Sequence, residues 1–448
     1  MKTPSTRHES AIRRSSKQFA SQKLLLLLTG TLAILCCLLM ASTASAQHVQ
    51  TIYSFGIQFP PTLTVPTASL IPDKAGNLYS IASNGGLAVD GQAAGGVFEL
   101  SPPATKGGPW KYTPIYLFAS QSDGFGPIGD LVMDSNGALY GVTQEGGVGG
   151  SGYGVVYQLV PPAVSGGAWT ENVLYEFTAG NDGARPYAGL AFDKKGNLYG
   201  TTISAGSLGG GVAFELSPPA VSGGAWTYNL LYSFDATTDS PGGCSPFGTL
   251  LLNFTGALFG TTTGCGANGG GVAFKLTPPA NGQGAWTETV LHSFGSFTDT
   301  ADGSGPFARL TPGAKGVLFG TTEGGGTSGD GVVYELLPPA TKGGAWTENV
   351  LYNFGSTSGG IYPSGGVTLT SSGALYGCLL AGTTSESGAV YKLAPPAVQG
   401  DPWTETPLVV FSGTVAPEGT PLFNGGAIFA TTFMGGTNGT GSVFKLNP

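Results

Sequence analysis

Six tryptophans recur along this chain at nearly equal intervals of 59, 57, 60, 60 and 57 residues. They are Trp110, Trp169, Trp226, Trp286, Trp346 and Trp403. Pairs of adjacent prolines follow the same spacing, beginning at Pro102, Pro161, Pro218, Pro278, Pro338 and Pro395. Such a period is typical of repeat architectures, in which each unit buries its apolar face against the next. The chain is therefore interpreted as copies of one unit.

Each unit predicts four short strands. Segments 187–193 and 197–203 flank the sequence Asp-Lys-Lys-Gly, whose residues favour tight turns, so we expect a hairpin. Residues 212–216 alternate with the period of a strand, and the aromatic-rich segment 226–234 predicts the fourth. The prolines that begin at Pro218 end the third strand because proline cannot donate to a ladder.

Four strands per unit of this length indicate a propeller blade. The fourth strand ends on a phenylalanine seven times, at Phe55, Phe118, Phe177, Phe234, Phe294, Phe354 and Phe411. The first copy, 49–55, lacks its first three strands, and the last unit stops after its third at 443–446. We therefore predict an all-β, seven-bladed propeller of four-stranded blades, closed by pairing of the N-terminal and C-terminal strands so that no edge stays open.

Glycine and proline, 77 and 31 of 448 residues, make a mostly helical protein improbable. Without a period they would indicate disorder, but 41% of residues are hydrophobic and most glycines recur at turns and loops of the unit. Loops so poor in side chains offer little chemistry.

The first 46 residues predict a secretory signal peptide. Six basic residues occur within the first 23, an apolar stretch covers 24–40, and Ala44-Ser45-Ala46 is a small-residue cleavage site. Its removal leaves 12 basic residues (18 − 6) and 25 acidic ones (26 − 1), a net charge of −13. We expect one domain over 47–448, secreted or periplasmic and monomeric, with neither a nucleic-acid partner nor membrane insertion.

The repeat motif G-N-L-Y-G-T-T, followed by a Gly-rich loop and G-G-V-x-F-x-L, occurs at Gly196–Thr202 and again at Gly320–Thr322 with Gly331–Leu336. It resembles the bacterial GloVer-type tandem-repeat ("choice-of-anchor") proteins, and the resemblance covers residues 48–448. The resemblance implies a propeller-like repeat fold and assigns no activity.

Cys244 and Cys265 flank one predicted hairpin of the fourth blade, whose turn is centred midway between them. Direct cross-strand pairing would bring their sulfurs within bonding reach, and an exported protein favours a disulfide. Cys378 is interpreted as a small buried hydrophobe. His292 occupies a position that is tyrosine in most units and is interpreted as a drifted repeat residue, so histidine-based catalysis or metal binding is not expected.

Carboxylates recur in the loop that enters the first strand, at Asp123, Asp182 and Asp302, with Asp239 and Glu418 nearby in degenerate copies. Propeller topology places them on the face of the Gly-rich loops, beside Glu145, Glu323, Asp330 and Glu386. This acidic rim could bind Ca²⁺ through oxygen ligands. Alternatively, Asp-Gly recurs because it makes a turn. We expect no other cofactor.

A ligand site is predicted at the mouth of the central channel. Tyr187, Phe247 and Phe307 follow the loop proline in three successive blades, where they could stack on a carbohydrate ring or fill gaps between blades. Three positions after that proline, Asp130 and Arg309 interrupt a set of small, neutral residues three blades apart. They could orient a polar ligand or form a structural salt bridge.

These features favour a binding or interaction module, for carbohydrate or a cell-surface partner, over an enzyme, and no catalytic residue is assigned. Two alternatives stay open: an extracellular glycan hydrolase or lyase that uses carboxylates on the Gly-rich face, and a structural envelope protein.

Overall fold

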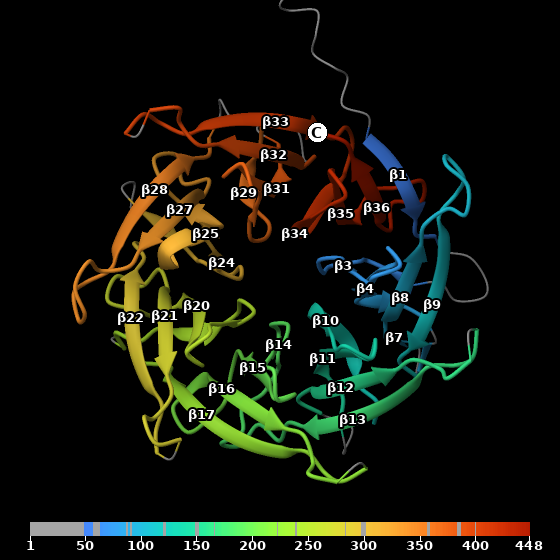
Figure 1. The fold of residues 1–448 in the computed structure, drawn as a ribbon, viewed down its shortest axis with the longest axis horizontal. Coiled ribbons are helices and arrows are strands. Elements are labelled where there is room, and N and C mark those ends of the chain that lie inside the picture. The colour runs from blue at the N-terminus through green and yellow to red at the C-terminus, as the bar shows by residue number, and fades with distance from the viewer. Residues whose placement is uncertain are drawn as a thin grey trace, which may run out of the picture. The chain divides into compact units, whose positions relative to one another are not determined.

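The computed structural model describes residues 49–448 apart from 57–62, 87, 90–91, 120–121, 148–151, 165, 222, 238–239, 283, 297–301, 356–358, 383–386 and 399. The predicted signal peptide, Asp239 and Glu386 lie outside these residues. Seven sheets radiate around a central axis, each forming one propeller blade (Figure 1). The described part contains one short 3-10 helix, η2 (Ala314–Gly316), and no α-helix. None of its helices is long and apolar enough to cross a membrane. The predicted fold class is confirmed.

The strands of each blade are given from the pore outward. Blade one has β3 (Ile71–Pro72), β4 (Leu78–Ala82), β8 (Gly96–Ser101) and β9 (Lys111–Leu117); blade two has β10 (Phe125–Met133), β11 (Leu139–Glu145), β12 (Val155–Val160) and β13 (Thr170–Glu176). Blade three has β14 (Ala191–Phe192), β15 (Leu198–Thr202), β16 (Gly209–Ser217) and β17 (Thr227–Asp235); blade four has β18 (Cys244–Pro246) and β19 (Leu251–Leu252) together at its inner position, then β20 (Leu258–Gly264), β21 (Val272–Thr277) and β22 (Thr287–Ser293).

Blade five has β24 (Thr311–Pro312), β25 (Leu318–Thr322), β27 (Val332–Leu337) and β28 (Thr347–Asn353); blade six has β29 (Ile361–Pro363) and β30 (Thr368–Leu369), then β31 (Leu375–Ala381), β32 (Ala389–Ala394) and β33 (Thr404–Val410). Blade seven has β34 (Ala416–Asn424), β35 (Ala427–Met434), β36 (Ser442–Leu446) and β1 (Val49–Ser54). Three short ladders join β2 (Leu63–Thr64) with β5 (Asn84–Gly85), β6 (Ala88–Val89) with β7 (Gln92–Ala93), and β23 (Gly303–Ser304) with β26 (Gly324–Gly325).

Blade seven joins the two ends of the propeller. β1 pairs antiparallel with β36, with Val49 opposite Leu446. The N–H of Phe55 donates to the carbonyl of Gly441 at 3.0 Å. The side chain of Asn438 donates in turn to the carbonyl of Phe55 at 3.0 Å. The predicted closure by the N-terminal and C-terminal strands is confirmed, and it removes the two sheet edges that an open ring would leave.

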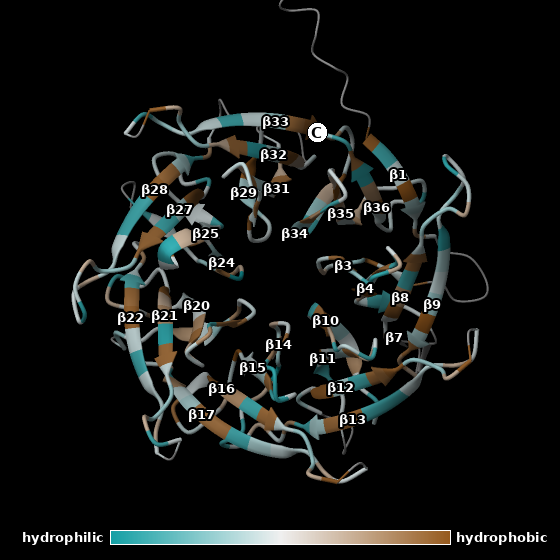
Figure 2. Ribbon diagram, in the orientation of Figure 1, coloured by the Kyte–Doolittle hydropathy of each residue, from teal (hydrophilic) through white to brown (hydrophobic). Residues whose placement is uncertain are grey.

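The core lies between blades. The phenylalanine that ends each outer strand contacts an aromatic ring on the third strand of the next blade, with ring centroids 4.9–5.3 Å apart. The seven pairs are Phe55–Phe98, Phe118–Tyr157, Phe177–Phe214, Phe234–Phe274, Phe294–Tyr334, Phe354–Tyr391 and Phe411–Phe444. Hydropathy alternates along the outer strands (Figure 2), because one face meets the neighbouring blade and the other meets solvent.

These rings also explain a glycine that turn chemistry does not. Gly200, in the middle of β15, lies opposite Phe214 of β16. A Cβ atom on Gly200 would lie 2.5 Å from Cζ of that ring, closer than real side chains approach. The glycine of the L-Y-G motif is therefore needed for close packing inside the blade.

The first strand of blade three is shorter than predicted. β14 covers Ala191–Phe192, whereas the sequence predicts 187–193. Residues 187–189 leave the ladder because they pack against the next blade, where the N–H of Gly189 donates to Oγ1 of Thr249 at 3.0 Å. In blade two the register of β10 shifts between Ile128 and Val132. As a result, residues 187–189 of blade three and 128–130 of blade two line the pore.

The predicted disulfide joins Cys244 and Cys265, whose Cα atoms are 5.3 Å apart. The expected direct pairing is wrong by one residue, because Cys244 lies opposite Gly264 in the ladder. Cys265 has a φ of 59°, so the chain turns out of the strand at this residue. Cys378 is buried as predicted, and burial raises the pKa of its thiol to about 12.

Candidate functional site

All seven blades contribute to one cavity of about 200 Å³ at the pore. Two positions of each unit line it, the first and the third after the loop proline. The first positions are Thr67, Ile128, Tyr187, Phe247, Phe307, Ser364 and Glu418. The third positions are Ser69, Asp130, Gly189, Thr249, Arg309, Gly366 and Thr420. The five residues that the sequence singles out as ligand-binding candidates therefore lie in the same pocket.

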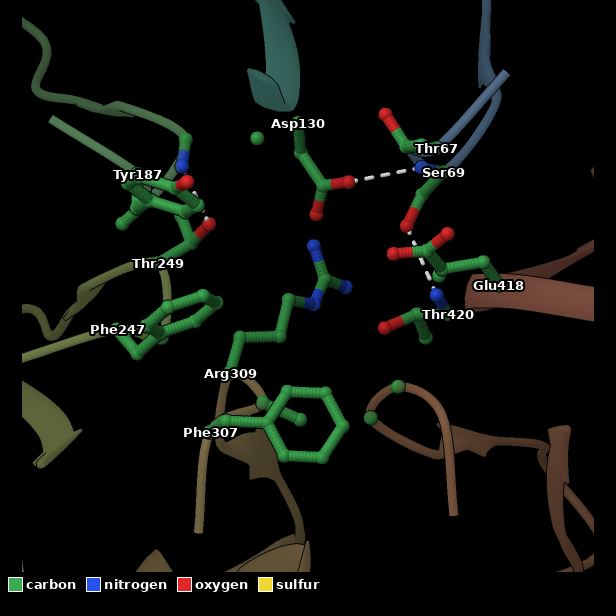
Figure 3. Close-up of a pocket in the computed structure, with 18 of the residues that line it drawn as sticks. Thr67, Ser69, Asp130, Tyr187, Phe247, Thr249, Phe307, Arg309, Glu418 and Thr420 are labelled. Atoms are coloured by element: carbon green, nitrogen blue, oxygen red, sulfur yellow. Dashed lines mark hydrogen bonds between the residues drawn. The ribbon is translucent and has the colours of Figure 1, made fainter. Parts of the chain in front are cut away.

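Aromatic rings form one side of the pocket. The rings of Tyr187 and Phe247 have centroids 5.0 Å apart, and those of Phe247 and Phe307 lie 6.3 Å apart, nearly perpendicular. Each side chain is half-buried. The rings thus contact one another across adjacent blades and still present part of their surface to the cavity (Figure 3). The two interpretations offered by the sequence, gap filling and ligand contact, are compatible.

Asp130 and Arg309 point toward each other across the pocket (Figure 3). The N–H of Ser69 donates to Oδ1 of Asp130 at 2.9 Å, which fixes this carboxylate to the neighbouring blade. In the part of the chain that the structure describes, the two charged groups do not form an ion pair within 4.0 Å. The salt-bridge interpretation is therefore not supported, and both groups keep bonding capacity for a ligand.

Glu418, which the sequence places only among degenerate copies of the loop aspartate, lines the pocket. It lies across the pocket from Tyr187, near Ser69 and Thr420 (Figure 3). Burial raises the pKa of its carboxyl group to about 7. Its carboxyl forms no hydrogen bond with any described residue. Its place directly after Pro417, equivalent to that of Tyr187 after its own proline, is the signal that could have identified it.

The three loop aspartates do not converge on one site. Asp123 accepts a hydrogen bond from the hydroxyl of Tyr116 at 3.0 Å, and Asp182 accepts one from Tyr175 at 3.1 Å. Both also accept backbone N–H groups of their own loops. Each aspartate therefore ties its loop to an outer strand, as the turn interpretation expects. Asp302 lies at the equivalent place between blades four and five.

The remaining members of the predicted acidic rim do not form a joint cluster with these aspartates among the described residues. Glu145 and Glu323 are exposed, Asp330 is half-buried, and Glu386 lies outside the described part.

The sequence matches the family described as the Gloeobacter/Verrucomicrobia repeat over residues 39–241 and 149–359. A search of curated proteins finds no match. Among solved structures, the chain is similar to a putative oxidoreductase (glucose dehydrogenase) of Thermus thermophilus, with 16% identity and a TM-score of 0.41 over 89% of this chain and 99% of that one. A protein of unknown function from Dyadobacter fermentans has 11% identity and a TM-score of 0.41 over 89% and 98%. An α-L-arabinanase of Penicillium chrysogenum has 16% identity and a TM-score of 0.39 over 71% and 92%.

Proposed function

The chain belongs to the Gloeobacter/Verrucomicrobia repeat family, and on that premise we propose that this seven-bladed propeller is an exported binding module that holds one sugar residue of an extracellular glycan in its pore pocket. Export is supported by the predicted signal peptide over residues 1–46 and by the Cys244–Cys265 disulfide, since disulfides persist in oxidising compartments.

The two-sided character of the pocket carries the proposal. Tyr187, Phe247 and Phe307 offer apolar ring surface, and Asp130 and Arg309 offer charged hydrogen-bonding groups beside it. A sugar ring has the matching character, with an apolar face of C–H groups and an edge of hydroxyls. The volume of about 200 Å³ is below the roughly 300–1,000 Å³ of pockets for drug-sized ligands. The pocket therefore suits a single sugar unit, such as the end of a chain.

The polar side of the pocket is preorganised. Asp130 is held by the Ser69 N–H, and the hydroxyl oxygen of Ser69 accepts a second hydrogen bond, from the Thr420 N–H at 2.9 Å. Three blades are linked in this way around one carboxylate. A ligand hydroxyl would meet an acceptor whose position is already fixed, which lowers the entropic cost of binding.

The test is a glycan-array screen with the purified protein, followed by calorimetric titration of each glycan bound. We expect Asp130→Asn, Arg309→Gln and Phe247→Ala to weaken binding at least about tenfold, which is the loss of one good contact. Phe254→Ala is a matched control, because Phe254 is fully exposed on a hairpin turn. Pocket variants that bind as tightly as wild type would refute the pore site. A wild-type protein that binds no glycan would favour a surface-protein partner or a structural envelope role.

A second candidate is glycan cleavage in the same pocket. Two carboxyl groups, those of Glu418 and Asp130, line the cavity, as paired acids do in glycosidases. The pKa of Glu418 near 7 keeps a proton available at neutral pH for a glycosidic oxygen. Reducing-sugar release from a polysaccharide panel tests this candidate. Release should fall above pH 7 and disappear in Glu418→Gln. Binding without release would exclude cleavage and support the binding module instead.

A further inference from the structure

Blade four departs from the repeat at one position on its outer strand. His292 of β22 occupies the position that is tyrosine in five other units, at Tyr53, Tyr116, Tyr175, Tyr232 and Tyr352. Its Nε2 atom lies 2.8 Å from Oδ2 of Asp302, in the loop between blades four and five. Glu348, on β28 of blade five, faces the same point, and the candidate ligand atoms of the three residues all lie within 4.8 Å of one another.

Hydrogen bonds hold the Asp302 carboxylate of this cluster in place. The N–H of Gly303 donates to Oδ1 of Asp302 at 2.7 Å, and the N–H of Gly295 donates to Oδ2 at 3.1 Å. Oε1 of Glu348 is buried and has no hydrogen-bond partner among the described residues, a feature it shares with the equivalent Glu171, Glu288 and Glu405. The side chains of His292 and Asp302 keep 24% and 17% exposure, so solvent reaches the cluster.

Charge also favours a cation at this place. Two carboxyl groups lie near each other, and no lysine or arginine of the described part forms an ion pair with either. The ion-pair partner of Asp302 is His292, which is charged only if protonated, so the carboxylates are incompletely compensated, and their proximity adds repulsion. A bound divalent ion would remove both penalties.

We propose that His292, Asp302 and Glu348 form a binding site for a divalent transition-metal ion of the Zn²⁺ class. One imidazole and two carboxylates are suitable donors for Zn²⁺, with water as a fourth ligand, whereas Ca²⁺ takes six to eight oxygens. Donors bonded at about 2.0–2.2 Å to one tetrahedral ion lie about 3.4 Å apart. His292 and Asp302, now 2.8 Å apart, would therefore separate by about 0.6 Å, and the widest separation in the cluster, at most 4.8 Å, would close by up to about 1.4 Å. The ion would clip blade four to blade five.

The boundary between blades one and two provides a natural comparison. Tyr116, Asp123 and Glu171 hold the same positions there, and the hydroxyl of Tyr116 donates to Asp123 at 3.0 Å. His292 makes the equivalent hydrogen bond to Asp302, but a neutral imidazole nitrogen, unlike a phenol hydroxyl, can also bind a metal. The histidine therefore distinguishes a metal site from an ordinary blade boundary.

Calorimetric titration of ZnCl₂ into the purified, chelator-treated protein, without a polyhistidine tag, tests the proposal. We expect one ion per chain in wild type and a higher thermal midpoint with Zn²⁺ than without it. His292→Tyr restores the common repeat residue, so it should fold, bind Zn²⁺ at least about tenfold more weakly and lose the Zn²⁺-dependent rise. Tyr116→His should add a second ion.

Two further measurements test the proposal independently of the His292 variant. Glu348→Gln preserves shape and should also weaken Zn²⁺ binding, which covers the case of a His292 variant that does not fold. CaCl₂ should bind more weakly than ZnCl₂. The proposal is overturned if wild type binds no Zn²⁺, if His292→Tyr and Glu348→Gln bind it as tightly as wild type, or if Ca²⁺ binds more tightly.

Discussion

Replacing Phe55 by alanine tests whether the N-terminal strand locks the propeller. Phe55 is fully buried, and its ring contacts those of Tyr53, Phe98 and Tyr112 at centroid distances of 4.9, 5.2 and 5.8 Å. Truncating a buried phenylalanine to alanine costs about 3–5 kcal/mol. With an unfolding entropy of about 2.1 cal/mol/K per residue over the unit Val49–Pro448, that loss lowers the thermal midpoint by about 4–6 °C.

The control is Phe354→Ala. Phe354 holds the same repeat position between blades five and six, at the end of an outer strand that belongs to the same continuous chain segment as the rest of its blade, and its ring lies 5.1 Å from that of Tyr391. Circular dichroism melts of both variants should show similar decreases if the pairing of β1 with β36 holds the outer strand of blade seven as firmly as the outer strand of blade five is held. Phe254→Ala, at a fully exposed ring, should leave the midpoint unchanged.

A Phe55→Ala midpoint equal to that of wild type, with a clear loss in Phe354→Ala, would refute the reasoning, because the closure would then not stabilise the ring. Deleting residues 47–56 removes β1 altogether and should lower the midpoint further than Phe55→Ala does.

Three further predictions concern stability. Replacing Cys244 and Cys265 together by serine should cost about 3 kcal/mol in urea unfolding, since the disulfide closes a loop of sequence separation 21; an unchanged unfolding midpoint would contradict this. Burial raises the pKa of Glu288 from 4.5 to about 7, so the folded state holds a proton that the unfolded chain releases. The thermal midpoint should therefore fall as the pH rises from about 4.5 to 7, less steeply in Glu288→Gln, and equal slopes would count against the assignment. Gly200→Ala should lower the free energy of unfolding in urea by about 1–3 kcal/mol, because the added methyl group would clash with Phe214. An unchanged free energy of unfolding would show that the blade rearranges to accept the methyl group.

The repeat pattern was sufficient to predict the blades. A fixed spacing of tryptophans and prolines specifies one supersecondary unit, and the incomplete units at both ends specify closure, since neither can complete a sheet alone. The disulfide followed from the same logic, but its register did not. The extra turn at Cys265 depends on backbone angles that the residue types do not dictate.

The pocket could be predicted only in part. Asp130 and Arg309 stand out from the repeat average, and equal spacing around a ring places them roughly opposite each other. Glu418 is hidden in a degenerate loop copy, and its raised pKa comes from burial by other blades. From the sequence alone, His292 looks like an ordinary substitution at a repeat position, because its neighbours Asp302 and Glu348 lie in other segments of the chain.

The sequence by itself therefore determined the seven-bladed closed ring, because a periodic chain repeats its local interactions in every unit. Only the tertiary structure decided which positions face the axis. In blade three, residues after the loop proline leave their own ladder, and the N–H of Gly189 bonds to Thr249 of the next blade, beside the pore-facing Tyr187. Contacts between units depend on where the ring brings different copies together, which a period along the chain does not encode.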